Sequence, residues 1–348
     1  MTASPRIAVL GAGSIGCFVG GAWAAAGVPV SFVGREKIGA AIAQDGLTLT
    51  DYSGWRVRLA PERVAFSTKP ASLAEAEVIA LCVKSTGTAA AAKEIGRHAK
   101  KGAIVLSFQN GVSNAETLGG LLKGRFEVVP GMVPFNVAYL GHGRFHKGVA
   151  GELVAKDTPL TRRLAEAIGE GPAALRLTAD MTGIAWGKLL INLNNAVNAL
   201  SGRTLLEQLR ERDYRRVVAA SIVEALGVLD AAGIRPAKIG PVPPNLLPHV
   251  IASPNLIFNN LFLKIQKIDA RARSSMYDDL AAGRETEVDY LNGEVVKLGR
   301  KVGRPTPVNA RIVSLIKQRE AGVEHLWTSG KLLEHVLEGT RVAPIFGY

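Results

Sequence analysis

Short apolar runs recur through the first half of the chain, and each is followed by a polar or glycine-containing stretch. Residues 7–10 and 30–33 form two of these runs, and residues 78–83 form a continuous apolar run of six residues. A strand buried on both faces has this continuous pattern, because neither face meets water. Since segments of helical composition separate the runs, this half predicts a doubly wound α/β sheet, with further strands at residues 103–108 and 126–129.

Two other segments are expected to add β structure. Residues 55–59 alternate between apolar and polar positions and are predicted to form a short hairpin with residues 64–67. Residues 133–154 read as a β-rich extension with turns at Gly141 and Gly151.

Beyond residue 180 the apolar positions follow helical spacing over much longer segments. Helices are predicted over residues 180–200, 206–232, 274–282, 287–302, 306–320 and 330–337. Prolines within residues 239–248 break the middle of this half into a loop that we expect to lie over a cleft. The pattern predicts two domains, a doubly wound α/β domain at residues 1–178 and an all-α domain at residues 179–348, whose apolar end it does not place.

The composition supports a folded chain and narrows the classes of partner. The chain has 348 residues, of which 47% are hydrophobic, and a length of this order favours two domains. Its net charge of +12 is spread over both halves, whereas nucleic acid needs a concentrated basic patch, so no nucleic-acid partner is expected. A dispersed positive field suits a small anionic substrate and a phosphorylated cofactor.

No membrane or targeting segment is expected either. The chain has no uncharged apolar run long enough to span a bilayer. The first residues lack the apolar core of a signal peptide, so a cytoplasmic protein is expected. Cys17 and Cys82 fall within a helix and a strand pattern and are expected to be buried thiols rather than a disulfide.

A glycine-rich turn follows the first strand and precedes a small-residue helix at residues 15–27. It reads Gly11, Ala12, Gly13, Ser14, Ile15 and Gly16. The first glycine permits a tight turn, the second lets a pyrophosphate approach the backbone, and the third lets helix and strand pack closely. Because the helix N-terminus also favours an anion, residues 1–178 are predicted to be a Rossmann-type dinucleotide-binding domain.

The end of the second strand distinguishes between the two nicotinamide dinucleotides. NAD sites place an acid there for the ribose 2′-hydroxyl group, and NADP sites accommodate the 2′-phosphate with arginine. Here Gly34 holds the strand end and Arg35 follows, which favours NADP. Glu36 could still reach the ribose if the turn runs differently, and Arg35 could be an ordinary exposed arginine.

Two polar residues come directly after other predicted strands. Lys84 follows residues 78–83, and Asn110 follows residues 103–108. Ligands bind at this edge of open α/β sheets, which favours a functional role for both. Taken singly, each could be a plain loop residue.

A polar stripe crosses an otherwise apolar helix in the C-terminal half. Lys188, Asn192 and Asn195 lie within 60° of one another at 100° per residue. A buried lysine needs a carboxylate or a polar cleft, so the stripe is a candidate catalytic face. The alternative is a structural salt bridge.

A candidate partner lies further along the chain. Gly283 can end one helix, and Thr286 with Asp289 resembles a capping box that starts the next, which would place Glu287 in a first helical turn. Ser274 and Ser275 are predicted to begin the preceding helix, whose first N–H groups suit a substrate carboxylate. The Ser274–Ser275 pair and the Thr286–Asp289 pair could also be helix caps with no further role.

These motifs, in this order, make residues 6–321 resemble the ketopantoate reductase (2-dehydropantoate 2-reductase) family of pantothenate biosynthesis. The resemblance implies that Lys188 is the catalytic lysine, that Glu287 is the acid assisting it and lies near the cofactor, and that Ser275 binds substrate. It also places Asn192 at the substrate, and Lys84 and Asn110 at cofactor- and substrate-side positions.

One position departs from the family pattern. A second asparagine is often found eight residues after the lysine, where this chain has Ala196, with Asn195 and Asn198 nearby. The pocket around the hydroxyl end of the substrate is therefore expected to differ, with Asn195 as a substrate-binding candidate. The tail beyond Glu324 is also longer than the family needs.

The sequence thus predicts NADPH-dependent reduction of a 2-oxo acid, 2-dehydropantoate or a related one, with Lys188 as general acid. The alternatives are an NAD-linked 2-hydroxy acid dehydrogenase of the same fold and a non-catalytic NADP sensor. No metal is expected, because the histidines show no ligand spacing. The sequence leaves a homodimer open.

Overall fold

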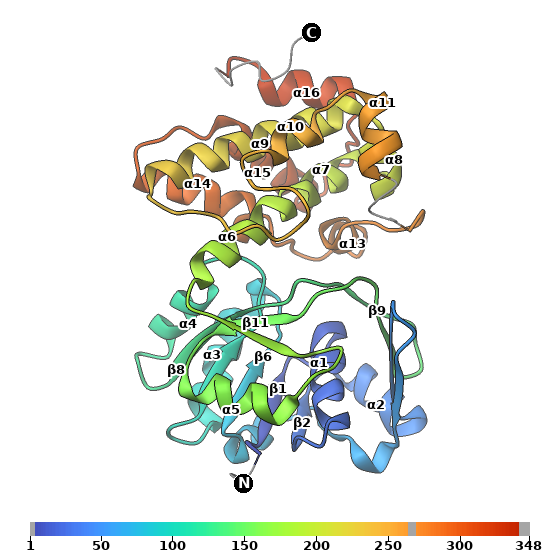
Figure 1. Cartoon of the computed structure of the whole chain (residues 1–348), viewed down its shortest axis with the longest axis vertical. Helices are drawn as coiled ribbons and strands as arrows, with labels where there is room; N and C mark the ends of the chain where they lie inside the picture. Colours follow the sequence, from blue (N-terminus) through green and yellow to red (C-terminus); the bar gives the residue numbers. More distant parts are fainter. Residues whose placement is uncertain (1–3, 264–268, 341–348) are drawn as a thin grey trace. The chain divides into compact units, whose positions relative to one another are not determined.

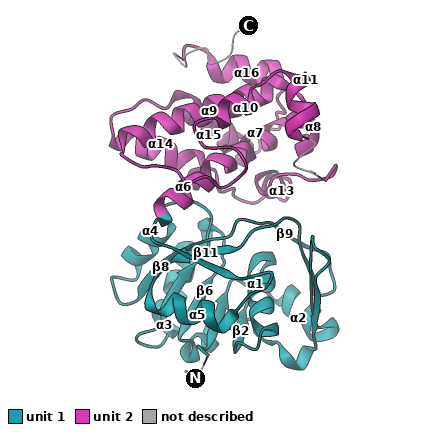
Figure 2. Ribbon diagram, in the orientation of Figure 1, with its two compact units in different colours: residues 1–181 teal, residues 182–348 magenta. Residues whose placement is uncertain are grey.

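The computed structural model describes residues 4–263 and 269–340. The chain divides into two compact units, residues 1–181 and 182–348 (Figure 2).

The first unit is built around an eight-stranded sheet with the order β12-β11-β8-β7-β6-β1-β2-β5 (Figure 1). Its strands are β1 (Ile7–Leu10), β2 (Val30–Val33), β5 (Ala65–Ser67), β6 (Val78–Leu81), β7 (Ile104–Ser107), β8 (Glu127–Met132), β11 (Leu153–Lys156) and β12 (Leu175–Thr178). The six strands from β8 to β5 are parallel, and β11 joins β8 in the antiparallel sense. The predicted α/β fold with a Rossmann-like sheet is confirmed.

Helices cover both faces of this sheet. They are α1 (Ser14–Ala25), α2 (Glu36–Asp45), α3 (Thr88–His98), α4 (Asn114–Leu121) and α5 (Pro159–Ile168). Successive residues of a strand point to opposite faces, so Ile7 and Val9 pack with α1 and α5, while Ala8 and Leu10 pack with α3 and α4. Burial on both faces explains the continuous apolar runs of the sequence.

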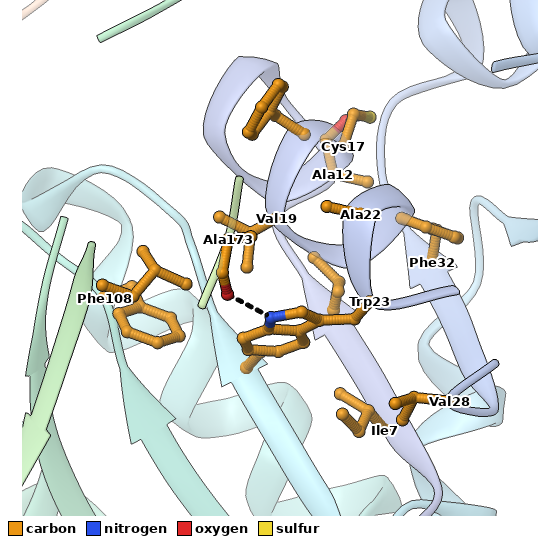
Figure 3. Packing of buried hydrophobic residues seen from close by; sticks show 14 of the residues in the cluster. Ile7, Ala12, Cys17, Val19, Ala22, Trp23, Val28, Phe32, Phe108 and Ala173 are labelled. Atoms are coloured by element: carbon orange, nitrogen blue, oxygen red, sulfur yellow. Dashed lines mark hydrogen bonds between the residues drawn. The ribbon is translucent and has the colours of Figure 1, made fainter. Parts of the chain in front are cut away.

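The helix after the glycine turn, α1, packs into the hydrophobic core on the face of the sheet that carries Ile7 and Val9. Trp23 of α1 is fully buried, lies with its ring 6.0 Å from that of Phe108, and donates a hydrogen bond of 2.9 Å from Nε1 to the Ala173 carbonyl oxygen (Figure 3). A Cβ on Gly20 would lie 2.6 Å from a Val9 methyl carbon, and this position therefore needs glycine.

The predicted hairpin between residues 55–59 and 64–67 is wrong. The segment β4 (Arg56–Leu59) pairs in the antiparallel sense with β3 (Leu47–Asp51), and β5 adds to the edge of the main sheet beside β2. The tight turn lies before β4 instead, where Asp51 Oδ1 accepts hydrogen bonds from the N–H groups of Ser53 and Trp55. An Asx turn closes the real hairpin, and this local signal outweighs the alternation used to predict the other one.

The β-rich character of residues 133–154 is confirmed. The strands β9 (Val137–Tyr139) and β10 (Arg144–Lys147) form a hairpin around Gly141, which has φ of 79°. With β3 and β4 they make a second sheet of four strands, in the order β4-β3-β10-β9.

The second unit is helical, with no strand among its described residues. Its helices are α6 (Met181–Asn192), α7 (Asn194–Ser201), α8 (Leu205–Arg210), α9 (Arg212–Ala231), α10 (Leu247–Ile251), α11 (Asn255–Ile257), a π-helical turn (Phe258–Phe262), α13 (Ser275–Ala281), α14 (Asn292–Lys301), α15 (Pro307–Glu320) and α16 (Ser329–Leu337). No helix in the described part of the chain is long and apolar enough to cross a membrane.

Two predicted long helices are each interrupted, and two other local features also differ from the prediction. Leu193 separates α6 from α7, and Glu211, with ψ of 117°, separates α8 from α9, so each predicted long helix is two. Pro248 does not break a helix but occupies the first turn of α10, where its missing N–H group costs nothing. The remaining difference, at Glu287, belongs to the candidate site.

The tail packs back onto its own unit. The predicted helix at residues 330–337 is confirmed as α16, where Leu332 and Val336 are fully buried. Tyr214 donates a hydrogen bond of 2.6 Å from its hydroxyl group to the Trp327 carbonyl oxygen, which ties the segment before α16 to α9. The apolar end of the tail, residues 341–348, lies outside the described residues.

Candidate active site

The glycine turn has backbone geometry that side chains would prevent. Gly11 has φ of 97°, and a Cβ there would lie 2.6 Å from the Val83 backbone nitrogen. A Cβ on Gly16 would lie 2.4 Å from the Gly11 carbonyl oxygen. The N–H groups of Gly11 and Ala12 both donate to the Val33 carbonyl oxygen, at 3.0 and 2.9 Å. The turn is therefore held tightly between β1, β2 and the residues after β6.

Gly13 differs from the other two glycines because a Cβ there would meet no atom within 4 Å. It is the N-cap residue of α1, makes no side-chain cap, and is followed by Ser14 and Ile15 in a first turn without an acid. The turn thus leaves open space beside Gly13 at a positive helix end. A pyrophosphate needs this combination of space and N–H donors.

Arg35 lies at the end of β2, beside this turn. Gly34 donates from its N–H group to the Ser67 carbonyl oxygen at 3.1 Å, and a Cβ there would lie 2.8 Å from the Ala12 Cβ. Arg35 is the exposed N-cap residue of α2, and Glu36 is the exposed first residue of that helix. Since β1 and β2 are neighbours in register, the arginine and the glycine turn share one edge of the sheet.

Lys84 and Asn110 lie at the same edge, after the adjacent strands β6 and β7. A buried polar network joins their two loops. Ser85 donates from Oγ to the Asn110 carbonyl oxygen at 2.9 Å, and Asn114 donates from Nδ2 to Ser85 Oγ at 3.1 Å and to the same carbonyl oxygen. Gln109 donates from Nε2 to the Lys84 carbonyl oxygen at 3.4 Å.

Lys84 itself is exposed and Asn110 is half-buried, so the network holds the backbone of both loops while their side chains remain near the surface. Sequence reasoning missed Ser85, Gln109 and Asn114 as supports. The only local signal for them was that polar residues follow a buried strand.

The sheet edge fits a dinucleotide. It brings together open space at Gly13, the uncapped start of α1, the exposed Arg35, and the Lys84 and Asn110 loops. The cofactor-binding candidates predicted from the sequence lie in the first unit, except for Glu287, which lies in the second.

Lys188 lies on α6 of the second unit and is half-buried. Desolvation lowers the pKa of its ammonium group to about 8, and the Glu287 carboxylate partly opposes this shift. The segment after α9 packs directly on this helix, because Ala237 donates from its N–H group to the Gly183 carbonyl oxygen at 2.8 Å and a Cβ on Gly187 would lie 2.2 Å from the Ala237 carbonyl oxygen. Gly187, the residue before the lysine, is thus required by close packing.

Glu287 is buried, with 7% of its surface exposed. It does not occupy the first turn of a long helix, as the sequence predicted. Instead it precedes a short 3-10 turn (Val288–Tyr290), and α14 begins only at Asn292. The predicted capping box is also wrong, because Asp289 forms an ion pair of 2.6 Å with Lys317 rather than capping a helix. Both residues of the predicted capping box are bound by α15 instead. Thr286 donates to Glu320, and Asp289 pairs with Lys317.

Ser274 and Ser275 begin α13, and their side chains differ in role. Ser274 is buried and caps the helix by accepting a hydrogen bond from the Tyr277 N–H group, whereas Ser275 is exposed. The Ser274 hydroxyl group also donates to the Asn195 carbonyl oxygen at 3.0 Å, and its N–H group donates to Asn198 Oδ1 at 2.9 Å. The start of α13 is thereby fixed against α7.

The structure therefore separates Asn192 and Asn195 from Asn198 among the asparagines after Lys188. Asn192 and Asn195 are half-buried at the end of α6 and the start of α7, whereas Asn198 is fully buried and supports α13. Sequence reasoning noted Asn198 only as a neighbour of Ala196. Its helical spacing from Asn195 could have indicated the same face, but its partner Ser274 is remote in sequence.

A cavity of about 260 Å³ in the first unit lies away from these residues. It is lined by the C-terminal half of α1, by Trp55–Val57, by Ile168 and by residues 170–174. Since the glycine turn is at the opposite end of α1, this cavity is not the dinucleotide site. Among the described residues, no group of three or more His, Cys, Asp or Glu side chains could hold a metal ion.

The glycine turn, the sheet edge and the helical unit with its Lys188–Glu287 pair define a dinucleotide-binding oxidoreductase. Residues 7–159 match the family model of ketopantoate reductase PanE/ApbA, and residues 180–320 match the model of its C-terminal domain. The chain belongs to the ketopantoate reductase family. Reduction of a 2-oxo acid, a small molecule, is the reaction that this membership implies.

Individual relatives align along nearly the whole chain. The 2-dehydropantoate 2-reductase of Pyrococcus abyssi is 28% identical over 325 residues, which covers 91% of this chain and 98% of that protein. The structure of a PanE/ApbA family ketopantoate reductase from Ralstonia eutropha JMP134 is 30% identical, with a TM-score of 0.77 over 92% of this chain and all of that one. A ternary structure of D-mandelate dehydrogenase with NADH and anilino(oxo)acetate shares the fold at 20% identity, with a TM-score of 0.72 over 91% of this chain and 99% of that one.

Proposed function

We propose that this protein is an NADPH-dependent reductase of a 2-oxo acid, either 2-dehydropantoate or a related compound, with Lys188 as its general acid. The observation that carries the proposal is the Lys188–Glu287 pair in the second unit. Burial brings the lysine pKa to about 8, near neutral pH, where a group can both hold and release a proton. An ordinary surface lysine, with a pKa near 10.5, would be a weaker acid.

NADPH, when bound, supplies the hydride that the keto carbon of the substrate accepts. Lys188 then donates its proton to the developing alkoxide oxygen, so that the 2-oxo acid becomes a 2-hydroxy acid and the lysine is left neutral. Glu287 keeps Lys188 charged before this step by its negative charge. Solvent can return the proton, because Lys188 is only half-buried.

The remaining candidate residues are proposed to bind and orient the substrate and the cofactor. Ser275 is exposed at the first turn of α13, where its hydroxyl group can hold the substrate carboxylate. Asn192 and Asn195 are proposed to orient the rest of the substrate from α6 and α7. Lys84 and Asn110 are proposed to contact the cofactor and the substrate from the edge of the sheet.

NADP is proposed over NAD because Arg35 is exposed at the end of β2, where the ribose 2′-phosphate would lie. D-mandelate dehydrogenase, which shares the fold, binds NADH, so the family fold alone does not select the cofactor. Glu36, exposed beside Arg35, is the residue that would support NAD binding.

The decisive experiment measures turnover of a panel of 2-oxo acids, including 2-dehydropantoate, with NADPH and with NADH. We expect the highest kcat/KM for a 2-oxo acid with NADPH. Preference for NADH and oxidation of a 2-hydroxy acid would favour the dehydrogenase alternative. Tight NADPH binding with no turnover of any 2-oxo acid would favour a non-catalytic sensor.

We also propose that the protein forms a homodimer through the second unit. Support comes from large apolar side chains that are exposed just before α10, on α11 and on the following π-helical turn, among them Leu256 with 77% exposure and Leu261 with 52%. Sedimentation velocity is expected to show a dimer that Leu256→Glu weakens. A monomer at all concentrations would refute this assembly.

A further inference from the structure

The segment that carries Glu287 is held from both sides by one helix. Glu287 lies in a connection between α13 and α14, and only a short 3-10 turn gives this connection regular structure. Such a connection does not by itself fix a carboxylate beside Lys188. The contacts made by the residues on either side of Glu287 therefore position its carboxylate.

Thr286, the residue before Glu287, is anchored to the end of α15. Its N–H group donates to Glu320 Oε1 at 2.8 Å, and its hydroxyl group donates to the same oxygen at 2.7 Å. The hydroxyl oxygen in turn accepts a hydrogen bond of 3.2 Å from the Val288 N–H group. The backbone on both sides of Glu287 is thus tied to one buried threonine, which is 2% exposed.

A second contact from α15 holds the other side of the connection. Lys317 Nζ lies 2.6 Å from Asp289 Oδ2 and 2.9 Å from Glu320 Oε2. It therefore joins the acid that holds Thr286 to an acid two residues beyond Glu287. Hydrogen bonds to Lys317 and Thr286 outweigh the desolvation of Glu320, so the pKa of Glu320 is lowered and its carboxylate stays charged.

The placement of Glu320 is unfavourable for its own helix. It is the last residue of α15, where a negative side chain opposes the helix dipole. The Lys317–Asp289 pair is also well exposed, and exposed ion pairs contribute little to stability. The stability of α15 alone does not account for this arrangement, whereas the geometry at Thr286 and Asp289 does.

We infer that α15 is a positioning clamp for Glu287, which holds its carboxylate beside Lys188 through Glu320 on Thr286 and Lys317 on Asp289. The inference rests on the proposed function of Lys188 and deepens it. Glu320, Lys317 and Thr286 are positioning residues, since they act through Glu287 and not on the substrate.

Other charged groups also surround this part of the unit. Glu285, Asp289 and Glu294, together with Glu287, raise the pKa of Tyr290, after its desolvation as the largest cause. Lys238 is exposed on the segment that packs on Gly187 of α6. Test substitutions must therefore distinguish movement of Glu287 from a change in the surrounding field.

Thr286→Val makes this distinction because it is uncharged and nearly isosteric. Losing the hydroxyl group lets the connection relax and weakens the contact between Glu287 and Lys188. Because Glu287 favours the charged lysine, the Lys188 pKa should fall below about 8. An opposite charge within contact distance shifts a pKa by about 1–3 units, so partial loss should lower it by about 0.5–1 unit.

The measurement is a ¹³C NMR titration of the cofactor-free protein labelled at the lysine ε-carbons, with the Lys188 signal assigned by its absence in Lys188→Met. We expect the Lys188 titration to move to lower pH in Thr286→Val and to return in Thr286→Ser, which keeps the hydroxyl group. The basic limb of the kcat profile should move by the same amount. An unmoved titration would overturn the clamp.

A matched control lies elsewhere in the same unit. The N–H and hydroxyl groups of Thr204 both donate to Glu207 Oε2 at 2.9 Å, and its hydroxyl oxygen accepts from the Glu207 N–H group at 3.3 Å. Thr204→Val therefore removes a hydroxyl group with equivalent hydrogen bonds, one donated and one accepted, without touching the Glu287 segment. It should leave the Lys188 titration in place; an equal shift in this control would also overturn the clamp.

Lys317→Met provides a second variant at an exposed position, which keeps the test available if Thr286→Val does not fold. Loss of a positive charge acting directly would raise the Lys188 pKa, whereas displacement of Glu287 would lower it. We expect the lower value, and a raised value would refute the clamp. Because the titration needs no turnover, these outcomes are independent of whether Lys188→Ala abolishes catalysis, which tests the proposed function.

Discussion

Replacing Lys188 with alanine separates the catalytic from the structural interpretation of the Lys188–Glu287 pair. If Lys188 donates the proton, the variant loses a group that acts mainly in the transition state. Positioned proton transfer contributes about 10²–10⁴-fold, so kcat should fall by that order. NADPH affinity should barely change, because the glycine turn and Arg35 lie in the first unit. Lys188→Arg should rescue little, because arginine does not release its proton near neutral pH.

The lysine pKa of about 8 sets the pH range of this prediction. At pH 7 about nine in ten molecules carry the charged, proton-donating form, and at pH 9 about one in ten do. Under saturating substrate and NADPH, kcat for reduction should therefore decline tenfold per pH unit above about pH 8, which stopped-flow absorbance of NADPH can follow.

The same pKa has a consequence for stability. The folded protein binds this proton more weakly than the unfolded chain, whose lysine pKa is near 10.5. The unfolded state therefore holds more protons between about pH 8 and about pH 10.5, and the contribution of Lys188 to stability rises with pH across this range. Lys188→Met should lose that rise in urea unfolding at pH 7.5 and 9.5.

A structural salt bridge predicts the opposite pattern. Its lysine pKa would be raised, so its stability would be lost as the pH increases, and Lys188→Ala would melt earlier with nearly normal kcat. Glu287→Gln would then cause similar damage. An active but unstable Lys188→Ala would refute the catalytic role.

Three further outcomes are expected. Arg35→Ala should raise the KM for NADPH by roughly 10- to 150-fold and the KM for NADH far less, because a charge-assisted hydrogen bond contributes about 1.5–3 kcal/mol. Equal effects on the two KM values in steady-state assays would contradict a role of Arg35 at the 2′-phosphate. Gly13→Val should fold normally, since a Cβ there meets no atom within 4 Å, but calorimetry should detect no NADPH binding. Gly16→Val should instead lower Tm, because its Cβ would lie 2.4 Å from the Gly11 carbonyl oxygen. Wild-type affinity in Gly13→Val would refute the dinucleotide role of the turn. Asn198→Ala should lower Tm and raise the substrate KM but not the NADPH KM, since it leaves the Ser274 N–H group without its acceptor; an unchanged substrate KM would limit Asn198 to stability.

Where neighbours in the chain decide the structure, the sequence was sufficient. The glycine turn could be predicted because strand, turn and helix are contiguous in the chain, so the spacing of the three glycines is visible in the sequence. The alternating α/β pattern and the helical second half could be predicted for the same reason, since burial on two faces or on one helical stripe leaves a periodic trace.

Where distant segments compete for the same partner, only the tertiary structure decided. Residues 64–67 were predicted to pair with β4, but they pair with β2 of the main sheet, while β4 pairs with β3. Thr286 and Asp289 looked like a local cap, yet Glu320 and Lys317 take both side chains from α15. A local cap and a remote ion pair have similar energies, so composition and spacing could not rank them. The packing of α15 beside this connection decides between them.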